Sequence, residues 1–308
     1  MGGILAFVGI LTLLGAGCQR TTGSTDATES QDNIPKIEVA ATVFPVYDMV
    51  RNVGKEHVQT HLILSPGVSP HIFEPTPSIL KKLANTKLVF AIGVGLDNWV
   101  DDIVKSGSGA KKITLERNIT LHEEEEHEEE EEEASEDEHG EFNPHYWLSP
   151  ANAIAMVQSI EEELSALDPT NATAYKQNAQ NYIAELRAKD TQWKTSITSL
   201  DNKNIVTFHD AFGYFAEHFG LSVLATFEEF PGKEPTPQYL ARLQEDVKEH
   251  NVKTMYLEPQ LAVGAIKSFA KDQNVELGIL DPLGGVDGRN SYIELIDYNV
   301  QTIVSTNK

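Results

Sequence analysis

The chain alternates between strand-like and helix-like segments, and the alternation restarts after one long helical stretch. Residues 37–44, 58–64 and 88–92 are short apolar or β-branched runs typical of strands, and segments with helical spacing follow them. Residues 170–200 carry apolar side chains three or four positions apart, which predicts a long helix. The pattern therefore predicts an α/β protein with two (βα)n lobes joined by a long rigid backbone helix.

The length of 308 residues is sufficient for two lobes that each have a hydrophobic core. The predicted organisation is a lipoprotein signal peptide, a flexible tether, an N-terminal lobe, a linking helix and a C-terminal lobe. Their expected ranges are 1–18, 19–36, 37–167, 168–202 and 203–308.

One short stretch accounts for most of the excess negative charge. Residues 122–141 hold 14 of the 47 acidic residues and no Lys or Arg, whereas the whole chain has a net charge of −23. Such a run repels itself and buries little apolar surface, so we expect an inserted loop rather than a domain. The acidity excludes a nucleic-acid partner, which requires a basic surface, and indicates cation handling instead.

The single cysteine, Cys18, excludes an internal disulfide and a zinc site built from several thiolates. Cys18 follows an apolar run, residues 4–16, that is too short to span a bilayer but suits a signal peptide. The residues before Cys18 resemble a lipoprotein cleavage box, which predicts a lipid anchor at Cys18 and an extracytoplasmic location. A disordered apolar leader with a free thiol is the alternative.

Four short loops each offer one potential metal ligand. They are the stretches around His71 (residues 69–75), His145 (143–147), His209 (208–210) and Asp281 (280–284). Three imidazoles and one carboxylate complete a tetrahedral zinc shell, and neighbouring prolines stiffen three of these loops. His71, His209 and Asp281 follow predicted strands, whose carboxyl ends border the ligand crevice of open α/β sheets. Singly, each side chain is more often a hydrogen-bonded loop residue.

Further acidic and histidine side chains are candidates for supporting roles. We expect Glu74, Asp210 and Glu258 to orient the ligand histidines through hydrogen bonds, although surface or buried salt bridges would also explain these acids. The acidic run contains His122, His127 and His139, which could bind metal weakly. A solvated charge run explains those three histidines at least as well.

Several motifs together resemble the solute-binding lipoproteins of bacterial zinc and manganese ABC importers, solute-binding protein family 9 (cluster A-I). The motifs are Pro-His-Ile-Phe-Glu-Pro (70–75), Asn-Pro-His-Tyr-Trp-Leu-Ser-Pro (143–150), His-Asp-Ala-Phe-Gly-Tyr-Phe (209–215), Leu-Glu-Pro-Gln (257–260) and Leu-Asp-Pro-Leu-Gly (280–284). The resemblance implies an interlobe metal site formed by His71, His145, His209 and either Asp281 or a water. It also implies a permease subunit and a separate ATPase as partners.

Within that family, zinc-type members carry a histidine at the third ligand position and manganese-type members carry a carboxylate. With His209 at this position, the chain resembles the zinc-type branch. Imidazole-rich tetrahedral sites also suit Zn²⁺, whereas Mn²⁺ prefers oxygen donors. The sequence therefore predicts a monomeric, non-enzymatic carrier of Zn²⁺, with Mn²⁺ less favoured. The alternatives are a manganese-type binding protein or adhesin, a metal-storage protein, and a zinc hydrolase with Glu74 as general base.

Overall fold

The computed structural model describes residues 36–105, 109–123, 141–228 and 233–307. The first half forms a four-stranded sheet with the order β2-β1-β3-β4, in which every neighbouring pair is parallel. Because parallel neighbours need a crossover, a helix or a long loop separates consecutive strands. The strands are β1 (Ile37–Ala41), β2 (Val58–Leu62), β3 (Leu88–Ala91) and β4 (Lys111–Thr114).

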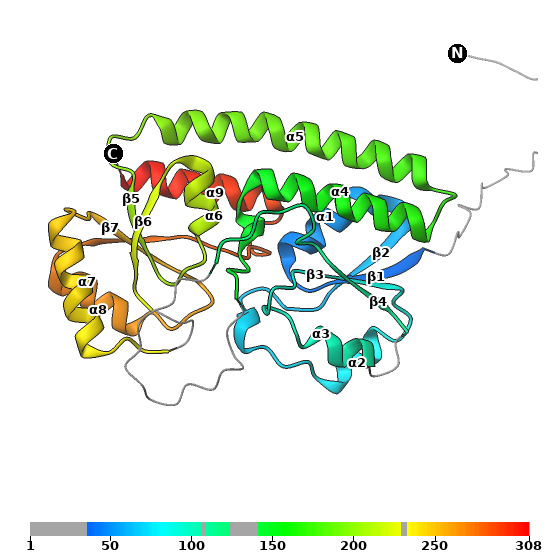
Figure 1. Ribbon diagram of the computed structural model, residues 1–308, viewed down its shortest axis with the longest axis horizontal. Coiled ribbons are helices and arrows are strands. Elements are labelled where there is room, and N and C mark those ends of the chain that lie inside the picture. The colour runs from blue at the N-terminus through cyan, green and yellow to red at the C-terminus, as the bar shows by residue number, and fades with distance from the viewer. Residues whose placement is uncertain (1–35, 106–108, 124–140, 229–232, 308) are drawn as a thin grey trace, which may run out of the picture. The chain divides into compact units, whose positions relative to one another are not determined.

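Both faces of this first sheet are covered by helices (Figure 1). Alternate residues of the central strands enter different cores: Val39 and Phe90 pack in one cluster, and Ala40 and Val89 in another. A parallel strand buried on both faces is continuously apolar, which explains the sequence of β3 (Leu88–Ala91). The helices are α1 (Phe44–Gly54) and α4 (Pro150–Leu167) on one face, and α2 (Pro77–Lys82) and α3 (Val100–Ile103) on the other.

The second half repeats this plan with the strand order β6-β5-β7-β8, again parallel throughout. Its strands are β5 (Asn204–Thr207), β6 (Ser222–Thr226), β7 (Thr254–Leu257) and β8 (Glu276–Ile279). Its helices are α6 (Gly213–Phe219), α7 (Pro237–Glu249), α8 (Gly264–Gln273) and α9 (Tyr292–Thr306). The predicted fold class, two α/β lobes, is confirmed; we call them the N-lobe and the C-lobe.

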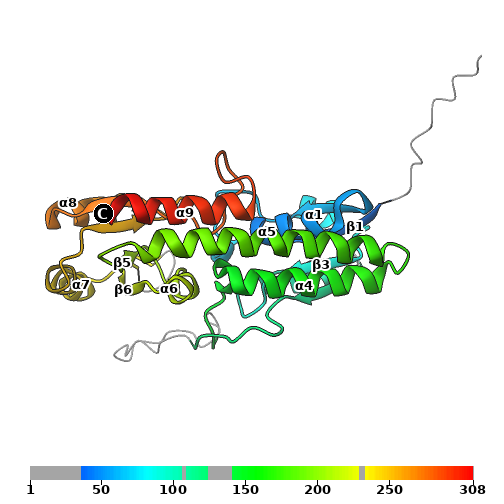
Figure 2. The ribbon, with the colours of Figure 1, turned by 90° about the horizontal axis from the view of Figure 1, so that it is seen from above.

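Helix α5 (Ala172–Thr198) is 27 residues long and runs beside both lobes (Figures 1 and 2). Tyr182 donates a hydrogen bond to Asp48 on α1, with an O–O distance of 3.2 Å. Further along the helix, the Trp193 indole donates to Asp297 on α9, with an N–O distance of 2.5 Å. Helix α5 is therefore anchored to elements of both lobes. The exact boundaries of the lobes stay a prediction.

Asp48 ties α1 to the C-lobe as well. Its Oδ2 accepts a hydrogen bond from the backbone N–H of Tyr292 at 2.9 Å, at the start of α9. Burial raises the pKa of the Asp48 carboxyl, although these hydrogen bonds and the nearby Arg51 charge act in the opposite direction. The contact is thus a buried polar link between the two lobes.

The start of the N-lobe differs from the prediction at one residue. Phe44 begins α1 instead of ending a strand, because Pro45 at the first turn favours helix and cannot donate to a sheet. Further along, the helical residues of α3 (Val100–Ile103) begin only after Asp97. Asp97 instead closes the preceding turn, and its carboxylate accepts from the backbone N–H groups of Ile92 (2.7 Å) and Gly93 (2.8 Å).

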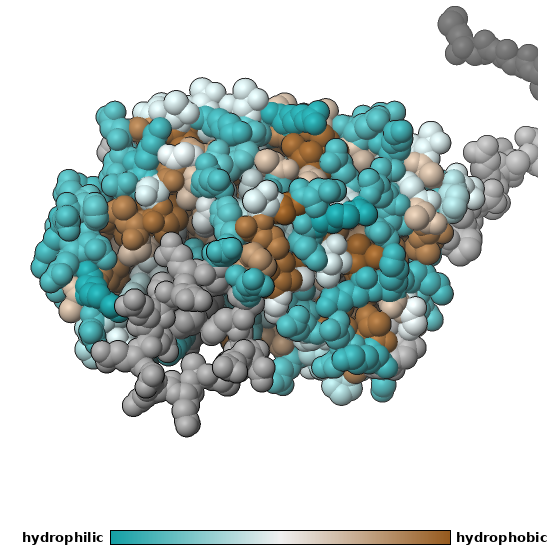
Figure 3. Space-filling model, viewed as in Figure 1, coloured by the Kyte–Doolittle hydropathy of each residue, from teal (hydrophilic) through white to brown (hydrophobic). Residues whose placement is uncertain are grey.

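On the face drawn in Figure 3, hydrophilic side chains surround several smaller hydrophobic areas. None of the helices in the described residues is long and apolar enough to cross a membrane.

Candidate metal centre

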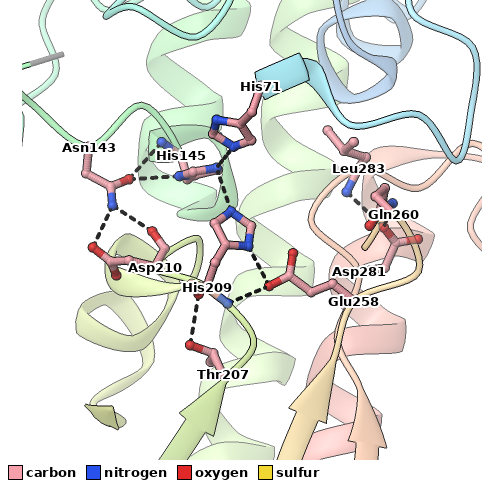
Figure 4. Close-up of polar contacts among 10 residues, drawn as sticks. All are labelled: His71, Asn143, His145, Thr207, His209, Asp210, Glu258, Gln260, Asp281 and Leu283. Carbon is pink, nitrogen blue, oxygen red and sulfur yellow. Dashed lines mark hydrogen bonds and ion pairs between the residues drawn. The ribbon is translucent and has the colours of Figure 1, made fainter. Parts of the chain in front are cut away.

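Three imidazoles from distant parts of the sequence converge on one point (Figure 4). The Nε2 atom of His145 lies 3.2 Å from Nε2 of His71 and 3.3 Å from Nε2 of His209. The ligand atoms of all three lie within 4.8 Å of one another. A tetrahedral ion with Zn–N distances of about 2.0–2.1 Å requires nitrogens about 3.3 Å apart. The three side chains therefore have the spacing of three corners of a zinc shell.

Each histidine is positioned by the element next to it. His71 lies in a single 3-10 turn, η2 (Pro70–Ile72), and His145 directly precedes another, η4 (Tyr146–Leu148). His209 lies two residues beyond the end of β5, at the carboxyl edge of the second sheet. His71 and His145 thus belong to the N-lobe and His209 to the C-lobe, and the site joins the two.

The hydrogen bonds of His145 fix the tautomer of its imidazole, and thereby the nitrogen that could bind a metal. Its Nδ1 lies 3.1 Å from Oδ1 of Asn143, and Asn143 in turn donates its Nδ2 to the backbone O (2.7 Å) and Oδ2 (2.9 Å) of Asp210. Because the amide nitrogen is used there, Oδ1 must accept, and Nδ1 of His145 carries the proton. Burial, followed by the charges of His209 and His71, holds the pKa of His145 well below its usual value. His145 is therefore neutral, with the Nε2 lone pair directed into the site.

His209 has a carboxylate partner on the opposite side of its ring. Its Nδ1 lies 2.8 Å from Oε1 of Glu258, which also accepts the backbone N–H of His209 at 3.2 Å. Burial by itself lowers the pKa of His209, but the Glu258 charge and hydrogen bond, with Asp210 and Glu228, raise it overall. A carboxylate that holds Nδ1–H in this way orients the ring and makes Nε2 a stronger metal ligand.

The surroundings of the three nitrogens are mostly apolar and lie between the lobes. The pocket is lined by the three histidines with Pro70, Trp147, Glu258, Gln260, Leu261, Pro282 and Leu283, among other residues. His145 and His209 are each only 4% exposed, whereas His71 belongs to the exposed class. An ion would consequently enter from the side of His71.

The chain matches the family described as zinc-uptake complex component A, periplasmic, over residues 39–306. It belongs to this family. The high-affinity zinc uptake system protein ZnuA of Bacillus subtilis is 31% identical over 300 residues, which cover 94% of this chain and 93% of that protein. The zinc-binding protein AdcA of Streptococcus pyogenes serotype M3 is 29% identical over 286 residues, which cover 87% of this chain and 55% of that protein. The chain thus spans about half the length of its AdcA relatives.

The fold agrees with that membership in the zinc-uptake family. A crystal structure of ZnuA superposes with a TM-score of 0.79 at 24% identity and covers 89% of this chain and 100% of that one. A likeness at 24% identity supports the architecture alone.

Asp281 was expected beside the three histidines, but its carboxylate is not part of their cluster. Within the described residues, the cluster of potential ligands consists of His71, His145 and His209. The Asp281 Oδ1 atom accepts instead from the backbone N–H groups of Leu283 (2.9 Å) and Gly284 (3.1 Å), because the Asp-Pro-Leu-Gly sequence turns back on its own carboxylate. Direct coordination by Asp281 stays a prediction.

The three acidic residues predicted to orient the histidines differ in their contacts. Glu258 contacts His209 directly, and Asp210 acts on His145 through Asn143, a partner that the sequence analysis missed. The only local signal for Asn143 is its position two residues before the histidine. Glu74 is exposed, and its orienting role for His71 stays a prediction.

The predicted auxiliary histidines lie apart from the three-histidine cluster or outside the described residues. His122 stacks on Tyr214 with 3.8 Å between ring centroids, and its Nε2 lies 2.7 Å from Oε2 of Glu217. His127, His139 and the proposed lipidation site Cys18 lie outside the described residues.

Glu258→Ala should weaken zinc binding by about 10–100-fold, the usual effect of removing a carboxylate that holds a ligand histidine. Glu258→Gln retains an oxygen acceptor for Nδ1–H and should lose less. Competition with a chromophoric chelator measures both, and Glu276→Ala, on an exposed position of β8, is the control. Equal affinities for wild type and Glu258→Ala would contradict the orienting role.

Proposed function

We propose that this protein is the extracytoplasmic zinc-binding component of an ABC importer, which passes Zn²⁺ to a membrane permease powered by a separate ATPase. Family membership supports the transport role, since this family consists of zinc-binding transport proteins and not of enzymes. The observation that carries the metal assignment is the triangle of Nε2 atoms, two of whose edges are 3.2 and 3.3 Å.

His71, His145 and His209 hold the ion in this proposal, and the protein contributes only imidazole to these three positions. Such a donor set favours Zn²⁺ over Mn²⁺, which prefers carboxylate and carbonyl oxygens. Asn143 and Glu258 fix the rings of His145 and His209, so the site is organised before the ion arrives. The protein acts as a monomer, anchored to the outer side of the membrane by a lipid at Cys18.

Capture at the three-histidine site should not depend on the acidic stretch. We expect the full chain and a variant without residues 124–140 to bind one tightly held Zn²⁺ each, with similar affinity in the presence of a competing chelator. Both proteins should also restore zinc uptake to cells that lack the chain. Loss of the tightly bound ion in the deletion variant would contradict the proposal and favour a metal-storage role for the acidic stretch.

A further inference from the structure

Asp281 is held by an arginine that lies on the far side of its carboxylate from the backbone turn. The Nη1 atom of Arg289 is 3.1 Å from Oδ2 of Asp281. Oδ1 is engaged by Gln260, whose Nε2 donates at 2.8 Å, in addition to the two backbone N–H groups. Both oxygens of this carboxylate, which is 1% exposed, are therefore occupied by groups of the protein.

The position of Asp281 is also fixed through its backbone. Its N–H donates to Oδ1 of the buried Asn299 at 2.9 Å, and its carbonyl accepts from Nδ2 of the same residue at 2.8 Å. Asn299 lies on α9 and is fully buried. These two bonds fix the backbone at Asp281, directly before Pro282 and Leu283, which line the pocket.

Arg289 is held in place by contacts of its own side chain and backbone. Its guanidinium lies 4.4 Å from the centre of the Tyr298 ring, and a tight turn links its carbonyl to the N–H of Gly285 at 2.9 Å. The side chain is only 15% exposed. Its Nε atom is buried without a hydrogen-bond partner among the described residues, and its Nη1 atom meets Asp281 as an ion pair and not as a hydrogen bond. If Asp281 moved away, a buried cation would lose the anion that compensates it, which is strongly unfavourable.

We propose that Arg289 competes with the metal for Asp281 and keeps this carboxylate out of the coordination shell. The ion is then held by three imidazoles with an open fourth position, and the oxygen donor that Mn²⁺ would favour is withheld. Arg289 is thus a specificity-determining residue that acts through Asp281 without touching the ion. This inference rests on the proposed zinc site.

The test compares zinc and manganese affinities of wild type, Arg289→Gln, Asp281→Asn and the double variant. Arg289→Gln should tighten zinc binding by about tenfold and manganese binding by more, because Oδ2 becomes available as a ligand. Asp281→Asn alone should change zinc affinity by less than about threefold. In the double variant, Asp281→Asn should cancel the increase in zinc affinity that Arg289→Gln produces by itself. Arg242→Gln is the matched control, since Arg242 also stacks on a tyrosine, Tyr239, at 5.7 Å.

Absorption spectra of the Co²⁺-loaded proteins report the shell independently of affinity. We expect identical spectra for wild type and Asp281→Asn, and a changed spectrum for Arg289→Gln. Thermal unfolding of the metal-free proteins shows whether Arg289→Gln and Asp281→Asn retain their fold. If Arg289→Gln does not, the comparison of wild type with folded Asp281→Asn decides alone. A tenfold loss of zinc affinity or a changed spectrum in Asp281→Asn would overturn the inference.

Failure of this inference can be distinguished from failure of the zinc site itself. If His209→Ala abolishes tight binding but the Arg289 variant behaves as wild type, only the competition between Arg289 and the metal is refuted. If His209→Ala binds zinc as wild type does, the site is refuted, and the inference with it.

Discussion

Replacing His209 by alanine should weaken zinc binding by at least about a hundredfold. Apparent binding free energies of structural zinc sites are about 10–16 kcal/mol for four ligands, so one ligand accounts for about 3 kcal/mol or more. His209 is also the only one of the three histidines contributed by the C-lobe, and its loss leaves the ion attached to the N-lobe alone. Isothermal titration with a competing chelator measures the change.

The control for this experiment is His250→Ala, which removes an imidazole at the exposed C-terminal end of α7. It should leave zinc affinity unchanged. Thermal unfolding without metal shows whether His209→Ala retains its fold. A folded His209→Ala variant with wild-type affinity would mean that the three nitrogens do not share an ion.

Trp147→Ala should lower the free energy of unfolding by about 3–5 kcal/mol, as is usual for a large aromatic side chain removed from a core. Trp147 is fully buried, and its Nε1 donates to the backbone carbonyl of Pro282 at 2.8 Å, across the interface between the lobes. The Tyr292 hydroxyl donates to the carbonyl of Trp147 at 2.8 Å. The substitution would leave both a cavity and an unpaired buried carbonyl.

Trp147→Phe separates these two contributions. It retains an aromatic ring but removes the N–H, and leaving the buried carbonyl of Pro282 unpaired should cost about 1–3 kcal/mol. Urea unfolding of the metal-free proteins measures both variants. A loss below 1 kcal/mol for Trp147→Ala would show that the packing between the lobes does not depend on this side chain.

The sequence was sufficient, for a physical reason, to predict the α/β lobes and to single out the three histidines that the structure brings together. Apolar strands such as β3 are recognisable because both faces are buried, and His209 directly follows such a strand. Since parallel strands end at one edge, a polar residue just beyond a strand is placed at that edge whatever the details of packing. His145 was identified by its proline-flanked loop.

The orientation of Asp281 could not be predicted in the same way. Its partners, Gln260 and Arg289, are 21 and 8 residues away in the sequence. Gln260 lies in the loop after β7, and Arg289 lies in the loop between β8 and α9. Asp-Pro predicts a turn, but not the donors that the turn directs at the carboxylate. The role of Asn143 was missed because it depends on Asp210, which is 67 residues away.

The division of the three histidines between the lobes sets the order in which an ion would leave. His71 and His145 belong to the N-lobe, and His209 follows a strand of the C-lobe. A slight separation of the lobes would break a single metal–nitrogen bond and leave the ion on two imidazoles, one of which, His71, is open to solvent. Unloading would then proceed one bond at a time, with the most exposed nitrogen available for exchange with an incoming acceptor.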